Sequence, residues 1–390
     1  MLPIGKLPAD LLSRLLEKAT VQDPRVLLGP GIGIDCAVID TGDTLLVLKS
    51  DPVTFTTEDI GWYAVQVNAN DIATTGATPR WFLITLLLPE TKTTPELVEN
   101  IFDQLSNACQ DIGASLVGGH TEVTYGLDRP ILMGTLIGEV DRDRLVTPRG
   151  AESGDRLLLT KGVPIEATAI LAREFGEELC LGGKETPSTN VERINEYNGE
   201  ESKKSKLGKQ DKQSIQDINT KAGWGLCPTN YLSEVELKQA RDFLYQPGIG
   251  VLREARIATQ VGRVHAMHDP TEGGIYTALW EMSQACGHSF RVNISSIPVP
   301  GLSRRICQML DIDPLAAIAS GSLLMAVAKD DAPGICDAIR EADISCTDIG
   351  EVISDPGGAT VWRQTEEGEL KPLPRPLRDA IAKLFEQNEK

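Results

Sequence analysis

The sequence of 390 residues contains few of the side chains on which transition-metal and thiol chemistry depend. It has four histidines, none of them in the HxxxH spacing, and its eight cysteines include no CxxC pair. Zinc sites and thioredoxin-like redox sites need such clusters, so the sequence argues against both classes. Because the first residues lack the pattern of a secretion signal, we expect no disulfide bonds.

Long apolar runs and an excess of basic residues are also missing. The longest apolar run, Trp81 to Leu88, is far shorter than the roughly 20 residues that cross a bilayer. Acidic residues outnumber basic residues by 56 to 38, and the formal charge of −18 repels nucleic-acid backbones and anionic membranes. We therefore expect a soluble, cytoplasmic protein that binds neither nucleic acid nor membrane. A phosphate compound would need a local cation, for which a divalent metal ion is the obvious candidate.

Residues 1–150 alternate between predicted strands and helices. Amphipathic patterns predict helices over about 57–74 and 95–111. Apolar runs predict strands at 44–49, 81–89, 114–117 and 131–140. The order strand, helix, strand, helix, strand, strand predicts a mixed α+β sheet with helices on one face.

Residues 151–365 contain a second unit of comparable size, followed by a tail at 366–390. Its predicted strands are 156–160, 264–267, 290–294, 322–328 and 346–353, and its predicted helices are 164–175, 274–286 and 332–341. A polar segment at about 178–232 interrupts the pattern. It has too few large apolar residues to offset the entropy of ordering, so we interpret it as a disordered insertion. A partner-docking arm is the alternative.

Glycines and carboxylates repeatedly meet at the ends of these apolar runs. The segments are GPGIGIDCAV (29–38), SD (50–51), VNANDIATTGA (67–77), GGHTE (118–122), HDPTEGG (268–274) and SGSLL (320–324). Glycine lets backbone N–H groups approach an anion closely, and carboxylates are the hard oxygen ligands that Mg²⁺ prefers. Each segment alone also has an ordinary interpretation as a turn, a cap or a packed strand end.

Three of these segments carry specific expectations. Asn68 and Asp71 stand at positions i and i+3, so they share one face of the predicted helix. The glycine pair 118–119 is expected to form a turn in which the backbone is accessible. The pair 273–274, at the start of a predicted helix, is expected to present free N–H groups to an anion. Together, the segments fit a Mg²⁺–nucleotide site better than a two-carboxylate hydrolase.

In this order, the six segments resemble the superfamily of aminoimidazole-ribonucleotide synthase, which also holds selenophosphate synthetase, thiamine-monophosphate kinase and the hydrogenase-maturation protein HypE. HDPTEGG, SGSLLMAV and the opening GKLPADLL are most similar to HypE-like proteins. The resemblance implies a PurM-like two-domain α+β architecture. In this architecture, the N-terminal mixed sheet pairs with that of a second subunit to form a barrel, and the C-terminal domain is an α/β sandwich. ATP and Mg²⁺ are expected in the cleft of this homodimer.

Matched position by position, the resemblance also implies roles for individual residues. It assigns metal and ATP handling to Asp35, Asp51, Asp71, Glu122 and Asp269, of which Asp51, Asp71 and Asp269 are the expected catalytic acids. It assigns nucleotide contacts to Gly33, Asp35, Asn68, Gly118, Gly119, Thr121, Gly273 and Gly274.

The activity implied is ATP-dependent phosphorylation of an oxygen atom, often of an amide or carbonyl, on a small-molecule or protein-bound acceptor. Two alternatives are a small-molecule kinase like thiamine-monophosphate kinase, and a nucleotide-binding protein that acts through a partner without turnover. The sequence departs from HypE in ending FEQNEK without a terminal cysteine and in carrying Glu272 where HypE usually has Arg. Ile34 stands where many relatives have an acid.

Overall fold

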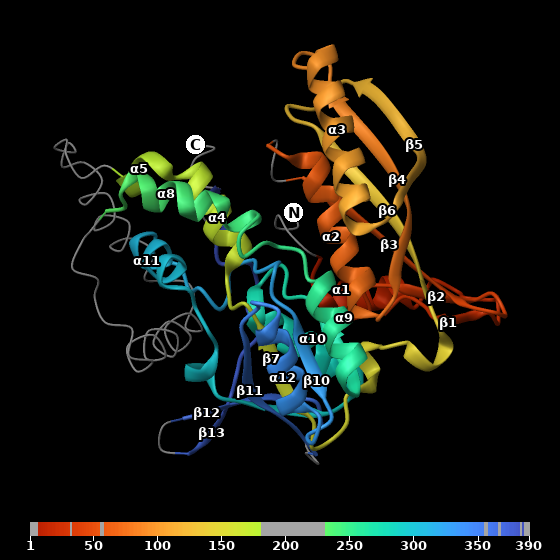
Figure 1. The fold of residues 1–390 in the computed structure, drawn as a ribbon, viewed down its shortest axis with the longest axis vertical. Helices are drawn as coiled ribbons and strands as arrows, with labels where there is room; N and C mark the ends of the chain where they lie inside the picture. Colours follow the sequence, from red (N-terminus) through yellow and green to blue (C-terminus); the bar gives the residue numbers. More distant parts are fainter. Residues whose placement is uncertain are drawn as a thin grey trace.

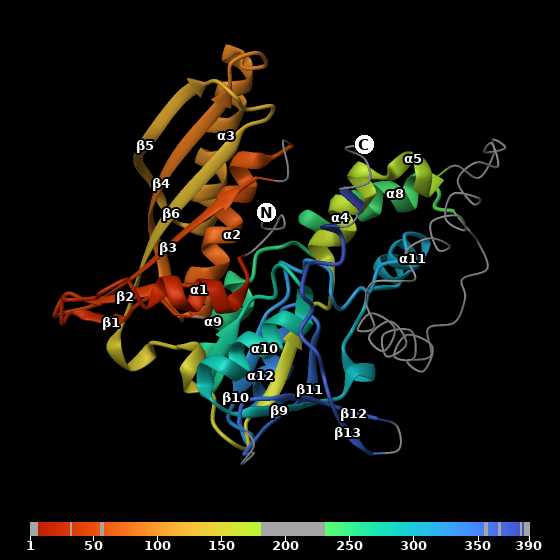
Figure 2. The ribbon, with the colours of Figure 1, turned by 180° about the vertical axis from the view of Figure 1, so that it is seen from behind.

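The computed structural model describes residues 7–31, 33–54, 58–180, 231–354, 358–365, 368–382 and 384–385. These residues form two mixed sheets, each with its own helices (Figures 1 and 2), so the predicted two-domain α+β architecture is confirmed. Within these ranges, no helix has the length and apolar character that a membrane span requires.

The N-terminal sheet has the strand order β1-β2-β3-β6-β4-β5. Its strands are β1 (Val26–Leu28), β2 (Ala37–Asp40), β3 (Leu45–Val53), β4 (Thr78–Pro89), β5 (Ser115–Thr124) and β6 (Ile131–Val140), and its helices are α1 (Ala9–Leu16), α2 (Ile60–Thr74) and α3 (Pro95–Ile112). Side chains on β4 alternate, so that Phe82, Ile84, Leu86 and Leu88 are buried. Helices α2 and α3 cover this buried face (Figure 1).

The predicted end of the third strand at residue 117 is wrong. β5 continues through the glycine pair to Thr124 because every residue from Leu83 to Pro89 on β4 offers a parallel backbone partner. The segment GGHTE is therefore part of an edge strand and not a turn.

The C-terminal sheet has the order β13-β12-β9-β11-β7-β10-β8. Its strands are β7 (Arg156–Thr160), β8 (Val264–His268), β9 (Ser289–Val292), β10 (Leu324–Val327), β11 (Cys346–Ile353), β12 (Val361–Gln364) and β13 (Leu370–Pro372). The helices are α4 (Ile165–Glu174), α5 (Gly176–Cys180), α8 (Glu234–Arg241), α9 (Leu252–Val261), α10 (Gly274–Cys286), α11 (Gly301–Met309) and α12 (Ala332–Glu341).

Most of the expected insertion, residues 181–230, lies outside the described residues, but both of its predicted ends are folded. Helix α5 extends to Cys180, and Leu179 and Leu232 are both buried. The backbone N–H of Leu232 donates to the Leu179 carbonyl at 2.7 Å. These two leucines, at the predicted ends of the segment, pack with α4, α8 and α11.

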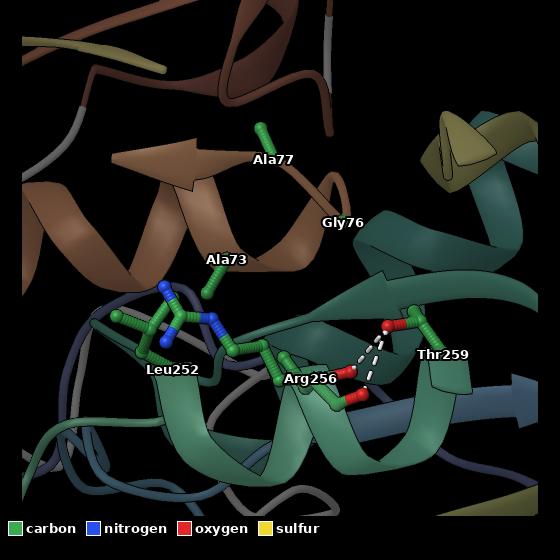
Figure 3. A pocket seen from close by; sticks show the side chains of 7 residues that line it. Ala73, Gly76, Ala77, Leu252, Arg256 and Thr259 are labelled. Atoms are coloured by element: carbon green, nitrogen blue, oxygen red, sulfur yellow. Dashed lines mark hydrogen bonds between the residues drawn. The ribbon is translucent and has the colours of Figure 1, made fainter. Parts of the chain in front are cut away.

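The two domains are joined tightly where α2 meets the chain that enters α9. Buried Asn70 donates its side-chain amide to the Ile249 carbonyl at 2.8 Å and accepts from the Val251 N–H at 2.9 Å. Figure 3 shows the neighbouring pocket between the end of α2 and α9, where the Thr259 hydroxyl bonds to carbonyls of its own helix. Its volume is about 10 Å³, enough for one water molecule, so it has no room for a substrate.

Candidate functional site

The structure brings four of the predicted acids together at the junction of the two domains. Asp35 precedes β2, Asp51 lies in β3 and Asp71 lies on α2, whereas Asp269 follows β8 in the other domain. Asp71 and Asp269 are 4% and 2% exposed. Burial raises the pKa of Asp71 well above its usual value, and the charges of Asp269, Asp35 and Asp51 raise it further. The four segments thus form one electrostatically connected site.

Lys49, which the sequence analysis did not single out, is the cation of this site. Its Nζ lies 3.0 Å from Asp71 Oδ2 and 3.3 Å from Asp51 Oδ1. Burial alone would lower the pKa of Lys49, but the three carboxylates of Asp71, Asp35 and Asp51 raise it well above its usual value. The sequence signal was present, because Lys49 and Asp51 are two residues apart on one strand and therefore share a face.

A second cation on the opposite side, His268, was also missed. The buried ring lies between two carboxylates, with Nδ1 3.2 Å from Asp35 Oδ2 and Nε2 3.0 Å from Glu281 Oε2. Burial lowers the pKa of His268, but these two neighbours outweigh it and raise the pKa well above its usual value. The positive imidazolium therefore links the Asp35 loop to α10.

Asn68 is fully buried, and its side chain is bonded at both ends. Its Oδ1 accepts from the backbone N–H of Asp51 at 3.1 Å, while its Nδ2 donates to the Ala64 carbonyl at 2.8 Å. Asn68 therefore fixes the backbone at Asp51.

The glycine loop before β2 is pressed against α10. Gly33 has a φ of +69°, and a Cβ added there would lie 2.7 Å from the Glu281 carbonyl oxygen. Only glycine fits this conformation and this close approach without strain. The resulting packing places Asp35 beside His268.

The expectation of free N–H groups at Gly273 and Gly274 is wrong for this structure. The Gly273 N–H donates to Asp379 Oδ2 at 2.6 Å, and the Gly274 N–H donates to the Thr271 carbonyl at 3.0 Å. Burial raises the pKa of Asp379 to about 6. The chain's own carboxylate, supplied by the C-terminal segment, occupies the position expected for an external anion.

Gly118, Gly119, Thr121 and Glu122 do not join the four acids within one chain. Across the sheet, Asp51 on β3 pairs with Gly134 on β6, which pairs with Ile84 on β4, which in turn pairs with Gly119 on β5. Three strand spacings separate β3 from β5, or about 14 Å. Glu122 lies on the exposed edge strand, with its carboxylate 3.2 Å from His120 Nε2.

The donors at the junction suit magnesium bound together with a ligand. Asp269 Oδ1 is buried, and among the residues that the structure describes it has no hydrogen-bond partner. In the part of the chain that the structure describes, no three histidine, cysteine or acidic side chains are arranged to hold a metal ion by themselves. Magnesium usually takes one or two carboxylates and completes its shell with phosphate oxygens and water, so this donor set fits.

A further buried acid, Glu166, lies near the C-terminal side of the site. It stands in the first turn of α4, and its carboxylate accepts from the Ser320 N–H of the SGSLL segment at 3.1 Å. Burial raises the pKa of Glu166 to about 7, and the charges of Asp379 and Asp269 also raise it. No periodic pattern or motif in the sequence points to this residue.

Comparisons with known proteins agree on one family. Residues 33–140 match the AIR synthase related protein N-terminal domain, and residues 234–363 match the corresponding C-terminal domain. A putative hydrogenase expression/formation protein of Methanocaldococcus jannaschii is 27% identical over 320 residues, covering 80% of this chain and 77% of the relative. Carbamoyl dehydratase HypE of Cupriavidus necator is 25% identical over 324 residues, covering 82% and 75%.

Solved structures show the same fold. A HypE–HypF complex superposes with a TM-score of 0.65 at 19% identity, covering 94% of this chain and 99% of the other. HypE in complex with ATP gives 0.59 at 20% identity, covering 94% and 90%. Selenide, water dikinases and a thiamine-monophosphate kinase are also among the relatives.

We expect Lys49→Met to lower the free energy of unfolding by about 3 kcal/mol at pH 7, because it leaves buried carboxylates without their counter-charge. The loss should shrink as the pH falls, since Asp71 can then take up a proton. Urea denaturation measures both effects. Lys238→Met, in which the lost side chain is 81% exposed, should stay within about 0.5 kcal/mol of the unmodified protein. Equal stability of the two variants would contradict the assignment of Lys49.

Glu166 should make stability fall as the pH rises from about 4.5 to about 7. In this range, the folded protein retains a proton that the unfolded chain has released, so deprotonation costs the folded state roughly 3 kcal/mol in total. Glu166→Gln should remove this slope, whereas Glu90→Gln, at an exposed turn, should preserve it. Urea unfolding at pH 5, 6, 7 and 8 tests this, and parallel pH profiles for the unmodified protein and Glu166→Gln would refute it.

Proposed function

The chain belongs to the AIR synthase related superfamily, and we propose that it is an ATP- and Mg²⁺-dependent enzyme of the HypE-like type. It phosphorylates an oxygen atom of a small-molecule or protein-bound acceptor, such as a carbonyl or amide oxygen, and thereby activates it. One observation carries the proposal: four acids from both domains converge at the junction, and one of them, Asp269, has a buried oxygen that no described residue partners.

In this proposal, Asp51, Asp71 and Asp269 are the catalytic acids, and with Asp35 they would hold magnesium. When bound, the ion would supply the charge that lets a triphosphate approach this acidic wall. Before nucleotide binds, Lys49 lies between Asp51 and Asp71 and supplies the positive charge that a bound cation would later share with it.

The remaining residues of the site hold the acids and the adjoining loop in position. Asn68 fixes the backbone of Asp51, Asn70 ties α2 to the loop before α9, and His268 anchors Asp35. Phosphoryl transfer depends mainly on positioning and on neutralising charge, so a site built from fixed carboxylates and cations matches its requirements.

The N-terminal sheet supports a homodimer as part of the same proposal. Opposite α2 and α3, the sheet exposes apolar side chains on neighbouring strands, including Trp81, Met133 and Val117. A second copy that packs on this face would bury them and would close a barrel. β5 is one of the two edge strands of this sheet, and a Cβ added at Gly118 would meet no atom of the described residues within 4 Å. We therefore assign Gly118, Gly119, Thr121 and Glu122 to the nucleotide site of the partner subunit.

Asp51→Asn should weaken ATP binding in the presence of Mg²⁺ by about tenfold or more, since it removes one charge of the metal-binding set. It should also abolish ADP release in the presence of a protein-free metabolite extract. Calorimetric titration with ATP, with and without Mg²⁺, and a coupled ADP assay make these measurements. The matched control is Asp43→Asn, at an exposed turn, which should change neither quantity.

The outcomes separate the alternative functions. Unaltered binding and turnover in Asp51→Asn would overturn the site assignment. A phosphoryl group recovered on a stable small product identifies a small-molecule kinase. ATP binding with no ADP release under any acceptor mixture identifies a binding protein without turnover.

Met133→Lys should disrupt the dimer, because it places a charge in the middle of the exposed apolar sheet face. Light scattering coupled to gel filtration should give a dimer mass for the unmodified protein and a monomer mass for this variant. Val235→Lys, on the exposed side of α8, is the matched control and should remain dimeric. A monomeric unmodified protein at micromolar concentration would count against the barrel.

A further inference from the structure

A second pocket lies in the C-terminal domain, lined by residues from α12 and from the strands β7 and β11. Its volume is about 380 Å³, comparable to sites that bind small molecules. Charged residues dominate its lining together with one thiol: Arg156, Lys329, Cys336, Asp337, Arg340 and Asp348. None of these residues belongs to the phosphoryl-transfer site proposed above.

This pocket contains one member of a pair of contacting thiols. Cys336 on α12 lines the pocket, and its Sγ lies 3.5 Å from the Sγ of Cys346 at the start of β11. Cys336 is 6% exposed and Cys346 is 2% exposed, so the pocket provides access to the first and the second lies behind it. The two positions are ten apart along the chain, so the pair does not have CxxC spacing.

The surroundings give the two thiols different roles. The contact with Cys346 and the charge of Arg340 lower the pKa of Cys336, whereas the contact with Cys336 and burial raise the pKa of Cys346. Arg340 is fixed beside the pair because its guanidinium donates to the Cys346 carbonyl at 2.6 and 3.0 Å. Cys336 is therefore the thiol that reacts as a thiolate, and Cys346 is placed to attack it afterwards.

The rest of the lining indicates the charge of the reagent. Arg156 forms a two-pronged pair with Asp348, at 2.7 and 2.8 Å, which neutralises both groups. Lys329 is exposed, and Arg340 has a half-exposed side chain whose ion pair with Asp337 is long, at 3.4 Å. The lining carries three positive side chains (Arg156, Lys329 and Arg340) and two negative ones (Asp337 and Asp348), and this positive surplus favours a ligand that carries carboxylates.

We propose that Cys336 and Cys346 are a redox-active thiol pair, a modification site for anionic low-molecular-weight disulfides that enter through this pocket. The Cys336 thiolate attacks one sulfur of the disulfide, forming a mixed disulfide and expelling a thiolate that takes up a proton. Cys346 then loses its proton and attacks Cys336 Sγ, which expels the second thiol. Two protein thiols and one disulfide give one intramolecular disulfide and two small thiols, so atoms and electrons balance.

The test uses the full-length protein and glutathione disulfide as the probe. After incubation, the reaction is quenched with acid, remaining thiols are alkylated, and the protein is digested with trypsin without reduction. Because Arg340 separates the two cysteines, they fall into the peptides 330–340 and 341–363. We expect these peptides to appear as one linked species, two hydrogen masses below their sum, which dithiothreitol reverses.

Variants distinguish the roles of the two thiols. Cys346→Ser should accumulate glutathione on Cys336, whereas Cys336→Ser should modify Cys346 about tenfold more slowly. Cys286→Ser, which removes a half-buried thiol at the end of α10, is the matched control and should leave the linked yield unchanged. The linked peptides are measured on the unmodified protein, so this result does not depend on whether any variant folds. Recovery of both cysteines as alkylated peptides, or linkage only after denaturation in urea, would overturn the proposal.

Discussion

The repulsion among four carboxylates at the domain junction is the constraint on which the surrounding structure depends. Asp71 and Asp269 are buried from opposite domains, and burial and like charge both act to protonate them. Lys49 and His268 oppose this by bringing positive charge from each side. The domains can therefore close over the acids without a bound ligand, and the charge that a nucleotide–metal complex would meet is already partly balanced.

The same constraint explains why the loop between residues 248 and 251 is so heavily bonded. Lys161 pairs with Glu254 at 2.9 Å and donates to the carbonyls of Gly248 and Gly250. Asn70 satisfies the next two backbone groups of the loop from the other domain. Asp71 is the neighbour of Asn70, so the two bonds of Asn70 to the loop also help to hold the central carboxylate in place. Unbonded, these buried groups would each cost about 1–3 kcal/mol.

The sequence predicted the parts of this site that depend on local pattern. Apolar runs that end in acids located Asp51 and Asp269, and helical spacing placed Asp71 beside Asn68. The features of the site that the sequence could not predict depend on a partner residue that lies far away along the chain. The sequence around Gly118 and Gly119 is typical of a turn, but both residues form backbone pairs with β4 and so belong to a strand. In the sequence, Lys49 resembles an ordinary surface lysine, because its partner Asp71 lies on α2 and is brought near only by folding. The amides of Gly273 and Gly274 read as free because Asp379 lies more than a hundred residues away along the chain.

Asp379 also decides where phosphate can lie. The N–H of Gly273 can serve the tail carboxylate or a phosphate oxygen, but not both, because the amide has one hydrogen to donate. The tail is held independently of that bond: Ala380 donates to the Ala316 carbonyl at 3.0 Å, Arg375 stacks on Trp280, and the rings of Phe385 and Phe175 lie 5.8 Å apart. With the tail in place, the proposed nucleotide site would therefore hold a triphosphate on the side of Asp51 and Asp71. Binding at the start of α10 therefore requires the tail to move away, which ties the position of the C-terminal segment to the state of the site.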